Sequence, residues 1–98
     1  MSAPLIAVII PIYNGDKYFL RYFVTLDVQQ YPNLELIFVD NNSTDHLQKM
    51  VKQYCKFRQN TLLLKCEKQG SGAARNVGLK KARGEYISFL DVDKIDIY

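Results

Sequence analysis

Leu34-Glu-Leu-Ile-Phe-Val-Asp-Asn-Asn-Ser-Thr-Asp45 joins a short apolar run to a run of polar side chains. The apolar part, Leu34 to Val39, is short and contains β-branched residues, which is typical of a buried strand. The polar part offers carboxylate, amide and hydroxyl groups. Ser43 and Thr44 within it are good N-cap types for a helix from about Asp45 to Phe57. The stretch therefore predicts a strand that leads through a polar loop into a helix.

The same alternation of strand and helix continues on both sides of this stretch. Short apolar runs predict three further strands, and the longer stretches between them predict two further helices. Pro32 and Gly84 stand where those helices are expected to have ended. The strands are Leu5 to Ile10, Asn60 to Lys65 and Tyr86 to Leu90, although the leucines of the second could also be helical. One helix runs from about Asp16 to Gln30, and the other follows Gly70-Ser-Gly72 and continues to about Ala82.

This alternation indicates an α/β fold with three layers, in which helices cover both faces of a mainly parallel sheet. Right-handed crossovers leave few topologies, and we expect the strand order 3-2-1-4 within a single domain over residues 1–98. The order reverses at the first strand, and open sheets of this kind bind ligands in a crevice at the carboxyl ends of the strands. The residues that directly follow each strand are therefore the candidate site.

Composition and charge exclude several classes of protein. The net charge of +3 is too small to indicate nucleic-acid binding. Lys80, Lys81 and Arg83 fit the last turn of a helix, where cations complement the helix dipole. Cys55 and Cys66 lack metal-ligand spacing, which favours reduced thiols in a cytoplasmic protein. No apolar run approaches the roughly 20 residues of a membrane span and the chain does not begin with a signal-peptide pattern, so we expect a soluble, cytoplasmic domain.

Asp91 and Asp93 follow the strand from Tyr86 to Leu90 and carry the sharpest chemical signal. Because side chains alternate along a strand, these two carboxylates would share a face and repel each other. A divalent cation relieves that repulsion, and Mg²⁺ or Mn²⁺ prefers such oxygen ligands together with substrate phosphates. The spacing predicts a metal site that takes a diphosphate.

The other polar positions at the strand ends allow two interpretations each. Asp40 could accept from a ribose hydroxyl or a base N–H, or it could form an Asx turn that caps the next helix. Arg75 is either a planar donor for phosphate or base oxygens or an exposed helix arginine. Tyr13 could stack on a base or pack at the rim. Arg75 also stands where the third glycine of the dinucleotide fingerprint would be, which argues against that class of site.

Four stretches together resemble the N-terminal half of the family-2 inverting glycosyltransferases, which have the GT-A fold. They cover nearly the whole chain, in the order and spacing of that family. The stretches are Val8-Ile-Ile-Pro-Ile-Tyr-Asn14, Leu36-Ile-Phe-Val-Asp-Asn-Asn-Ser-Thr-Asp45, Gly72-Ala-Ala-Arg-Asn-Val-Gly78 and Gly84-Glu-Tyr-Ile-Ser-Phe-Leu-Asp-Val-Asp93.

The resemblance implies a nucleotide-diphosphate sugar donor, most often uridine-linked, and inverting transfer to an acceptor hydroxyl of a saccharide, lipid or protein. It implies that Mn²⁺ or Mg²⁺ is held by Asp93 against the phosphates. The residues that it places around the nucleotide are Pro11, Tyr13, Asn14, Asp40, Arg75 and Asp91.

Two departures from the family pattern change what we expect of this chain. Lys94 stands where the family often has a further aspartate, and a cation there would compete with the metal. The general base of the family lies well downstream of Asp93, so it is expected beyond Tyr98 and no catalytic residue is assigned. We therefore expect a truncated domain that binds donor but is inactive alone, and that in its full-length form is peripheral to the inner face of the membrane.

Truncation would also leave the end of the sheet around Ile87, Phe89 and Ile95 uncovered, which predicts a homodimer through that edge. The alternative function is a non-catalytic nucleotide-binding or interaction module. A receiver-like domain needs an acidic pair after its first strand, where this chain has Pro11-Ile-Tyr-Asn14, so that class is disfavoured.

Overall fold

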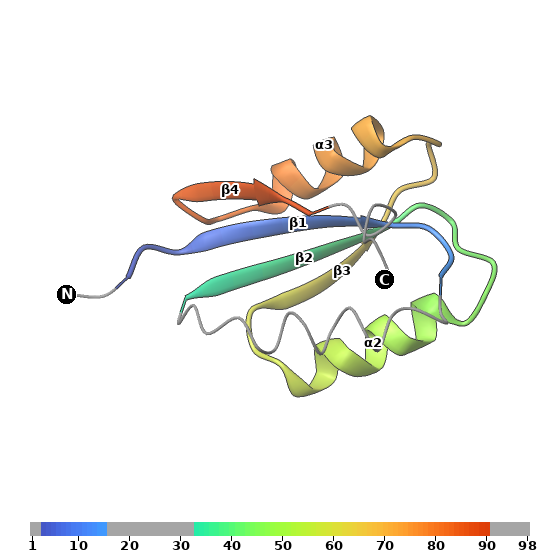
Figure 1. Ribbon diagram of the computed structural model, residues 1–98, viewed down its shortest axis with the longest axis horizontal. Coiled ribbons are helices and arrows are strands. Elements are labelled where there is room, and N and C mark those ends of the chain that lie inside the picture. The colour runs from blue at the N-terminus through green and yellow to red at the C-terminus, as the bar shows by residue number, and fades with distance from the viewer. Residues whose placement is uncertain (1–2, 16–32, 91–98) are drawn as a thin grey trace, which may run out of the picture.

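The computed structural model describes residues 3–15 and 33–90, with the exception of the Ser71 side chain. Four strands and two helices alternate along these residues (Figure 1). The predicted helix over residues 16–30, the carboxylates Asp91 and Asp93, and Lys94 and Ile95 lie outside the described residues. The elements are β1 (Ile6–Ile12), β2 (Leu34–Asp40), α2 (Leu47–Phe57), β3 (Thr61–Lys65), α3 (Ser71–Lys81) and β4 (Tyr86–Phe89).

The four strands form one sheet in the order β3-β2-β1-β4, and every neighbouring pair is parallel. The predicted order is confirmed. In the central pair, Ile6 lies opposite Leu34 and Ile12 opposite Asp40, so β1 and β2 end together. β4 pairs with the first part of β1, from Ile6 opposite Tyr86 to Ile9 opposite Phe89. The carboxyl ends of the two central strands therefore meet at one edge of the sheet.

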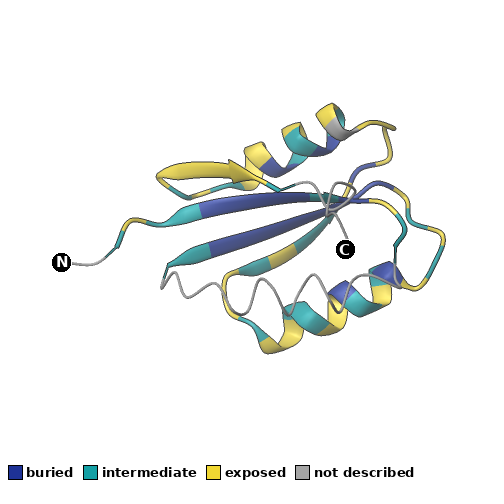
Figure 2. Ribbon diagram, viewed as in Figure 1, coloured by how far each residue is buried: buried dark blue, intermediate teal, exposed yellow. Residues whose placement is uncertain are grey.

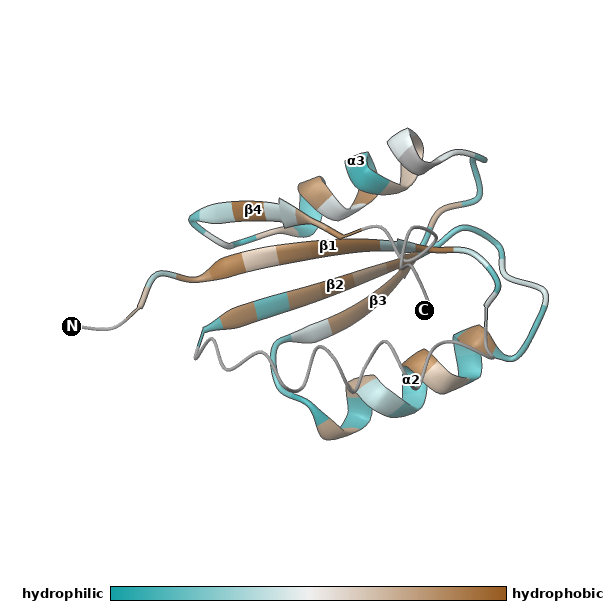
Figure 3. Cartoon of the chain, in the orientation of Figure 1, coloured by the Kyte–Doolittle hydropathy of each residue, from teal (hydrophilic) through white to brown (hydrophobic). Residues whose placement is uncertain are grey.

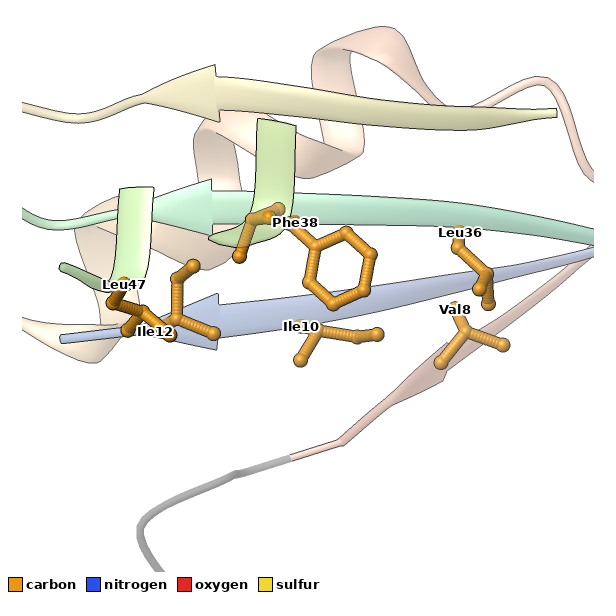
Figure 4. Close-up of a cluster of buried hydrophobic side chains, with 7 residues drawn as sticks. Val8, Ile10, Ile12, Leu36, Phe38 and Leu47 are labelled. Carbon is orange, nitrogen blue, oxygen red and sulfur yellow. The ribbon is translucent and has the colours of Figure 1, made fainter. Parts of the chain in front are cut away.

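Side chains of the central strands are buried on both faces, which confirms the three-layer arrangement. Alternate residues of β1 and β2 pack under α2 (Figure 4), and the residues between them pack under α3. Both strands are accordingly hydrophobic along most of their length and dark blue in the burial view (Figures 2 and 3). The cluster under α2 is Val8, Ile10, Ile12, Leu36, Phe38, Leu47 and Val51, and the cluster under α3 is Ile9, Ile37, Val39, Cys66 and Ala74.

β1 continues two residues past the predicted end at Ile10, through Pro11 to Ile12. Leu90 N–H donates to Ile9 O at 3.0 Å, so the main-chain groups of Ile9 face β4. By alternation Pro11 faces the same way, but β4 has ended at Phe89. The missing N–H of Pro11 therefore costs the sheet no hydrogen bond, and the prediction that the strand ends before the proline was wrong.

The helix boundaries also differ by a few residues from the predicted ones. α2 begins at Leu47 instead of Asp45, because Asp45 Oδ1 accepts from Leu47 N–H at 2.9 Å and so stands ahead of the first turn. α3 includes Gly72 and ends at Lys81. Because Asp45 lies ahead of α2 and not within it, its carboxylate also accepts a hydrogen bond from the loop after β1.

α3 lies close against the sheet at Gly78. A Cβ atom at Gly78 would lie 2.5 Å from Ile9 Cγ2, which is closer than two carbon atoms can approach. Gly84, in the turn before β4, is equally confined, because a Cβ there would overlap the main-chain nitrogen of Ala7. The two glycines fix the distance between α3, its turn and β1.

Arg83 does not lie in the last turn of α3, and its predicted role as a dipole-complementing cation was wrong. The helix ends at Lys81, and Arg83 instead binds Glu35 of β2, a side chain only 1% exposed. Arg83 N–H donates to Glu35 Oε1 at 2.8 Å and Arg83 Nε to Oε2 at 3.0 Å. The pair satisfies a buried carboxylate and fastens the α3–β4 turn to the sheet.

The cysteines and the lengths of the helices can be compared with the sequence-based expectations. Cys55 and Cys66 are both free, and burial raises the pKa of the Cys55 thiol above its ordinary value of 9.0. Among residues 3–15 and 33–90, no helix has the length and hydrophobicity that a transmembrane segment requires.

Candidate functional site at the carboxyl edge of the sheet

Three loops meet where β1, β2 and β3 end. They are residues 13–15 after β1, residues 41–46 after β2 and residues 66–70 between β3 and α3, and they gather at one end of the molecule in Figure 1. The first turn of α3 begins at the same edge. This edge is the one that the sequence predicted to bind ligand, because it lies outside the carboxyl ends of parallel strands.

Asn14 joins the loop after β1 to the loop after β2. Its N–H donates to Ser43 Oγ at 2.9 Å, and its Oδ1 accepts from Thr44 N–H at 2.8 Å. The next residue, Gly15, donates its N–H to Asp45 Oδ2 at 2.7 Å. Asn14 and Gly15 both have positive φ (50° and 104°), which asparagine and glycine tolerate better than other residues. These bonds hold Asn14 and Asp45 in fixed positions at the carboxyl edge of the sheet.

Asp40 lies at the end of β2 with its side chain fully enclosed. Its carboxylate accepts from Ser43 N–H at 3.2 Å, from the Ser43 hydroxyl and from Gln48 Nε2. The backbone N–H is three residues on, not two as in an Asx turn, so the bonds resemble a cap for the loop that leads into α2. The contact to a nucleotide stays a prediction. The same bonds connect the end of the strand to the first turn of α2, so Asp40 organises the floor of the site.

Asn41 was not singled out from the sequence, although it connects two of the three loops. Its Nδ2 donates to Cys66 O and to Lys68 O, both at 2.8 Å, and its Oδ1 accepts from Gly70 N–H at 3.0 Å. The side chain is buried, and it holds Gly70 at a positive φ of 116° directly before α3. The sequence offered one indication of this role: Asn41 directly follows Asp40 at the end of a predicted strand.

Arg75 reaches from α3 over the end of β4. Its guanidinium carbon lies 5.6 Å from the centroid of the Phe89 ring, in the range of a cation–π contact. Its Nε is buried and has no hydrogen-bond partner among the described residues. A buried donor without an acceptor is costly, by about 1–3 kcal/mol. An acceptor supplied by a ligand would remove that cost. Phe89, on which Arg75 stacks, is two residues before Asp91 in the sequence.

The remaining candidates lie around this centre. Tyr13, the first residue after β1, is 46% exposed, and Pro11 is half-buried within β1. The described residues alone contain no group of three or more acidic, histidine or cysteine side chains that could hold a metal. Oxygen donors for a hard divalent cation come from the sequence at Asp91 and Asp93, directly past the end of β4. Their chemistry fits Mn²⁺ or Mg²⁺.

The family model for glycosyl transferase family 2 matches residues 7–96. The chain belongs to this family. Its resemblance to family 2, stated above from four sequence stretches, is thereby confirmed. A glycosyltransferase of Haemophilus influenzae described as uncharacterized is 40% identical over 94 residues, which are 95% of this chain and 38% of that family-2 relative. The glycosyltransferase GlyG of Streptococcus pneumoniae is 37% identical over 92 residues, 93% of this chain and 31% of the relative.

Solved glycosyltransferases share the arrangement of strands and helices. TarS of S. aureus, residues 1–349, superposes with a TM-score of 0.81 at 35% identity over 91% of this chain and 27% of that one, and has also been solved with UDP. The mannosyltransferase PcManGT of Pyrobaculum calidifontis, in complex with GDP-Man and Mn²⁺, gives a TM-score of 0.80 at 28% identity. It matches 94% of this chain and 30% of its own. The expected GT-A fold is confirmed, and the chain spans about a third of the length of these family-2 proteins.

Proposed function

We propose that this chain is the donor-binding half of an inverting glycosyltransferase and binds a nucleotide-diphosphate sugar at the carboxyl edge of the sheet. The observation that carries the proposal is Arg75, whose buried Nε has no acceptor among the described residues and whose guanidinium lies over Phe89 at the end of β4. Support comes from the two solved relatives, one complexed with UDP and the other with GDP-Man and Mn²⁺. We propose uridine as the nucleoside.

Each candidate residue has a distinct role in this proposal. Pro11, Tyr13 and Asn14 border the nucleoside, with the exposed ring of Tyr13 available for stacking on the base. Arg75 donates to an oxygen of the base or of the diphosphate. Asp40 meets the base, and because Ser43 and Gln48 enclose its carboxylate, this contact requires that one of their hydrogen bonds be exchanged for one to the ligand.

We further propose that Asp93 holds Mn²⁺ or Mg²⁺ against the phosphates and that Asp91 supports the ribose side. A bound divalent cation would supply the positive charge that stabilises a departing nucleoside diphosphate. Arg75 would add its own fixed charge to the same region from the side of α3. Lys94 lowers the affinity for the cation by charge repulsion, which makes the metal dependence a property to measure.

The proposed reaction is attack of an acceptor hydroxyl on the anomeric carbon with inversion, the acceptor being a saccharide, lipid or protein. It needs a general base, a group that typically contributes about 10²–10⁴-fold in rate. Because the chain matches 27% of TarS and 38% of the Haemophilus influenzae relative, we place that base and the acceptor site in the part it does not span. We therefore expect negligible turnover from the 98 residues alone.

A calorimetric titration with UDP, with and without Mn²⁺, tests the proposal, with ADP and GDP as controls. We expect UDP to bind best, to bind more tightly with metal, and to lose the metal effect in the Asp93→Ala variant. An assay of UDP release from UDP-sugars on the same samples should show no turnover above buffer, while a full-length family-2 relative serves as the positive control.

The outcomes separate the alternatives. If none of the nucleotides binds at millimolar concentration, the donor-site proposal fails and an interaction module becomes the better account. If UDP binds but fusion to the remaining part of a relative never restores transfer, the chain is a non-catalytic nucleotide-binding module. Turnover by the 98 residues comparable to the positive control would contradict the assignment of the base to another part of the protein.

We also propose that the chain associates as a homodimer through β4. Ile87 and Phe89 of this strand are 40% and 45% exposed, and the strand lies at the end of the sheet. Exposed apolar edge strands tend to pair with another chain. The Ile87→Lys variant should sediment as a monomer where the wild type is a dimer. Leu62→Lys is the matched control, because Leu62 is 43% exposed on β3 at the opposite edge. A wild type that stays monomeric at high concentration would contradict the proposal.

A further inference from the structure

The outer face of α2 carries charge that the donor site does not use. Lys49, Lys52 and Lys56 are all exposed, and their spacing of three and four residues places them on one side of the helix. We call these three residues the lysine stripe. The opposite side of α2 carries Leu47 and Val51, which are buried against the sheet. The lysine stripe therefore points away from the protein core.

No acidic residue occurs anywhere in α2, from Leu47 to Phe57. A solvated helix usually intersperses glutamate with lysine, because like charges three and four residues apart destabilise it and opposite charges stabilise it. In the lysine stripe the repulsion is left uncompensated by the helix itself. Such an arrangement is stabilised by an anionic surface outside the protein.

An exposed aromatic side chain stands at the C-terminal end of α2, about 100° around the helix axis from the neighbouring Lys56. Phe57 is 85% exposed, the largest exposure of any large apolar side chain among the described residues. It follows Lys56 directly at the C-terminal end of α2. Lysines on a polar face beside an exposed phenylalanine are the composition of a surface that lies against a bilayer, with the cations at the headgroups and the ring below them.

The position of Phe57 leaves the donor site open. Leu36 N–H donates to Asn60 O at 2.8 Å, so the turn after α2 lies beside the beginning of β2. The polar loops with Asn14 and Asp40 lie at the other end of the strands (Figure 1). A surface in contact with Phe57 would therefore be at the far end of the sheet from the proposed nucleotide.

We propose that the lysine stripe and Phe57 bind the surface of a membrane that contains anionic lipids. Lysine is a flexible point charge that suits a fluid array of phosphates and carboxylates, whereas fixed planar ligands favour arginine. Each lysine near an anionic leaflet strengthens binding by about fivefold, so three lysines account for about a hundredfold. Because most of the binding comes from attraction between the lysines and the anionic headgroups, it weakens as salt screens the charges.

Co-sedimentation with vesicles tests this inference. We expect the wild-type chain to bind vesicles of phosphatidylcholine mixed with phosphatidylserine, and to be released as salt rises from about 0.1 M to about 0.5 M. The Lys49→Gln, Lys52→Gln, Lys56→Gln triple variant should bind about a hundredfold more weakly. The matched control removes three other exposed lysines, in Lys65→Gln, Lys80→Gln, Lys81→Gln, and should retain most of the binding.

The contribution of Phe57 has its own readout. The chain contains no tryptophan, so the Phe57→Trp variant has a single tryptophan, whose emission can be excited apart from that of the tyrosines. Its emission should shift to the blue with anionic vesicles, and a Tyr86→Trp variant, at a side chain 60% exposed on β4, should not shift. Absence of binding to anionic vesicles, equal loss in both triple variants, or an unshifted emission in vesicle-bound Phe57→Trp would overturn the proposal. Circular dichroism of each variant confirms that it is folded.

Discussion

At the scale of single residues, two arginines stack on aromatic rings in different ways. The guanidinium of Arg58 lies 5.9 Å from the Tyr54 ring centroid and its Nη1 donates to the Tyr54 hydroxyl at 3.1 Å. Arg75 lies 5.6 Å from the Phe89 ring but leaves its Nε buried without an acceptor. Among the described residues, Arg75 Nε is the buried side-chain donor without a partner, which is why Arg75 anchors the proposed site.

This difference predicts different effects of the same substitution. Arg75→Lys keeps the charge but loses the planar donor, and we expect it to weaken UDP binding about tenfold, the effect of one charge-assisted hydrogen bond. Arg58→Lys is the matched control and should leave UDP affinity unchanged. Isothermal titration calorimetry measures both, and equal affinities for the Arg75→Lys variant and the wild type would remove Arg75 from the nucleotide site.

The sequence predicted the roles of residues whose hydrogen-bond partners lie within a few positions along the chain. Asp40 lies in a stretch whose pattern already allowed a cap for the next helix, and its bonds to Ser43 and Gln48 span three and eight residues. Asn41 and Glu35 could not be assigned in this way, because their partners Gly70 and Arg83 are 29 and 48 residues away in the sequence. Contacts of that range depend on how the elements pack, which no local pattern specifies.

At the scale of elements, α3 contains two glycines with different surroundings. A Cβ at Gly78 would press against Ile9, whereas a Cβ at Gly72 would meet no atom within 4 Å. Of these two positions, only Gly78 therefore excludes a side chain.

Substitution of each glycine by alanine should therefore act in opposite directions. Gly78→Ala should lower the free energy of unfolding by about 1–3 kcal/mol, because the new methyl group displaces Ile9 or the helix. Gly72→Ala should raise it by about 0.5–1 kcal/mol through helix propensity. Urea denaturation followed by circular dichroism measures both changes. A stabilising Gly78→Ala would show that α3 is farther from β1 than described.

Element boundaries were the least predictable part of the fold. The apolar run predicts a first strand that ends at Ile10, before Pro11, but β4 ends before the proline would need a partner there. Where β4 ends beside β1 depends on the tertiary structure, and this allowed β1 to continue through Pro11. The type of the elements among the described residues, and the order of the strands, were predicted correctly from apolar runs and the rule of crossover handedness.

At the scale of the whole molecule, the lysine stripe lies apart from the other two proposed functions, which adjoin at Phe89 of β4. The nucleotide site lies at the carboxyl edge of the sheet, the lysine stripe covers the outer side of α2, and the dimer contact uses β4. The sequence predicted the first and the third from strand ends and an uncovered edge. The lysine stripe emerged only when the buried side of α2 was known, because that defines which side faces outward.

The position of the nucleotide is the central claim, and amide chemical shifts of ¹⁵N-labelled protein during a titration with UDP and Mg²⁺ test it most directly. We predict that shifts concentrate in residues 13–15, 41–45 and 70–76, whose loops meet at the carboxyl edge, while residues 56–60 at the opposite end stay unchanged. Shifts centred on residues 56–60, or spread evenly over the chain, would contradict the account.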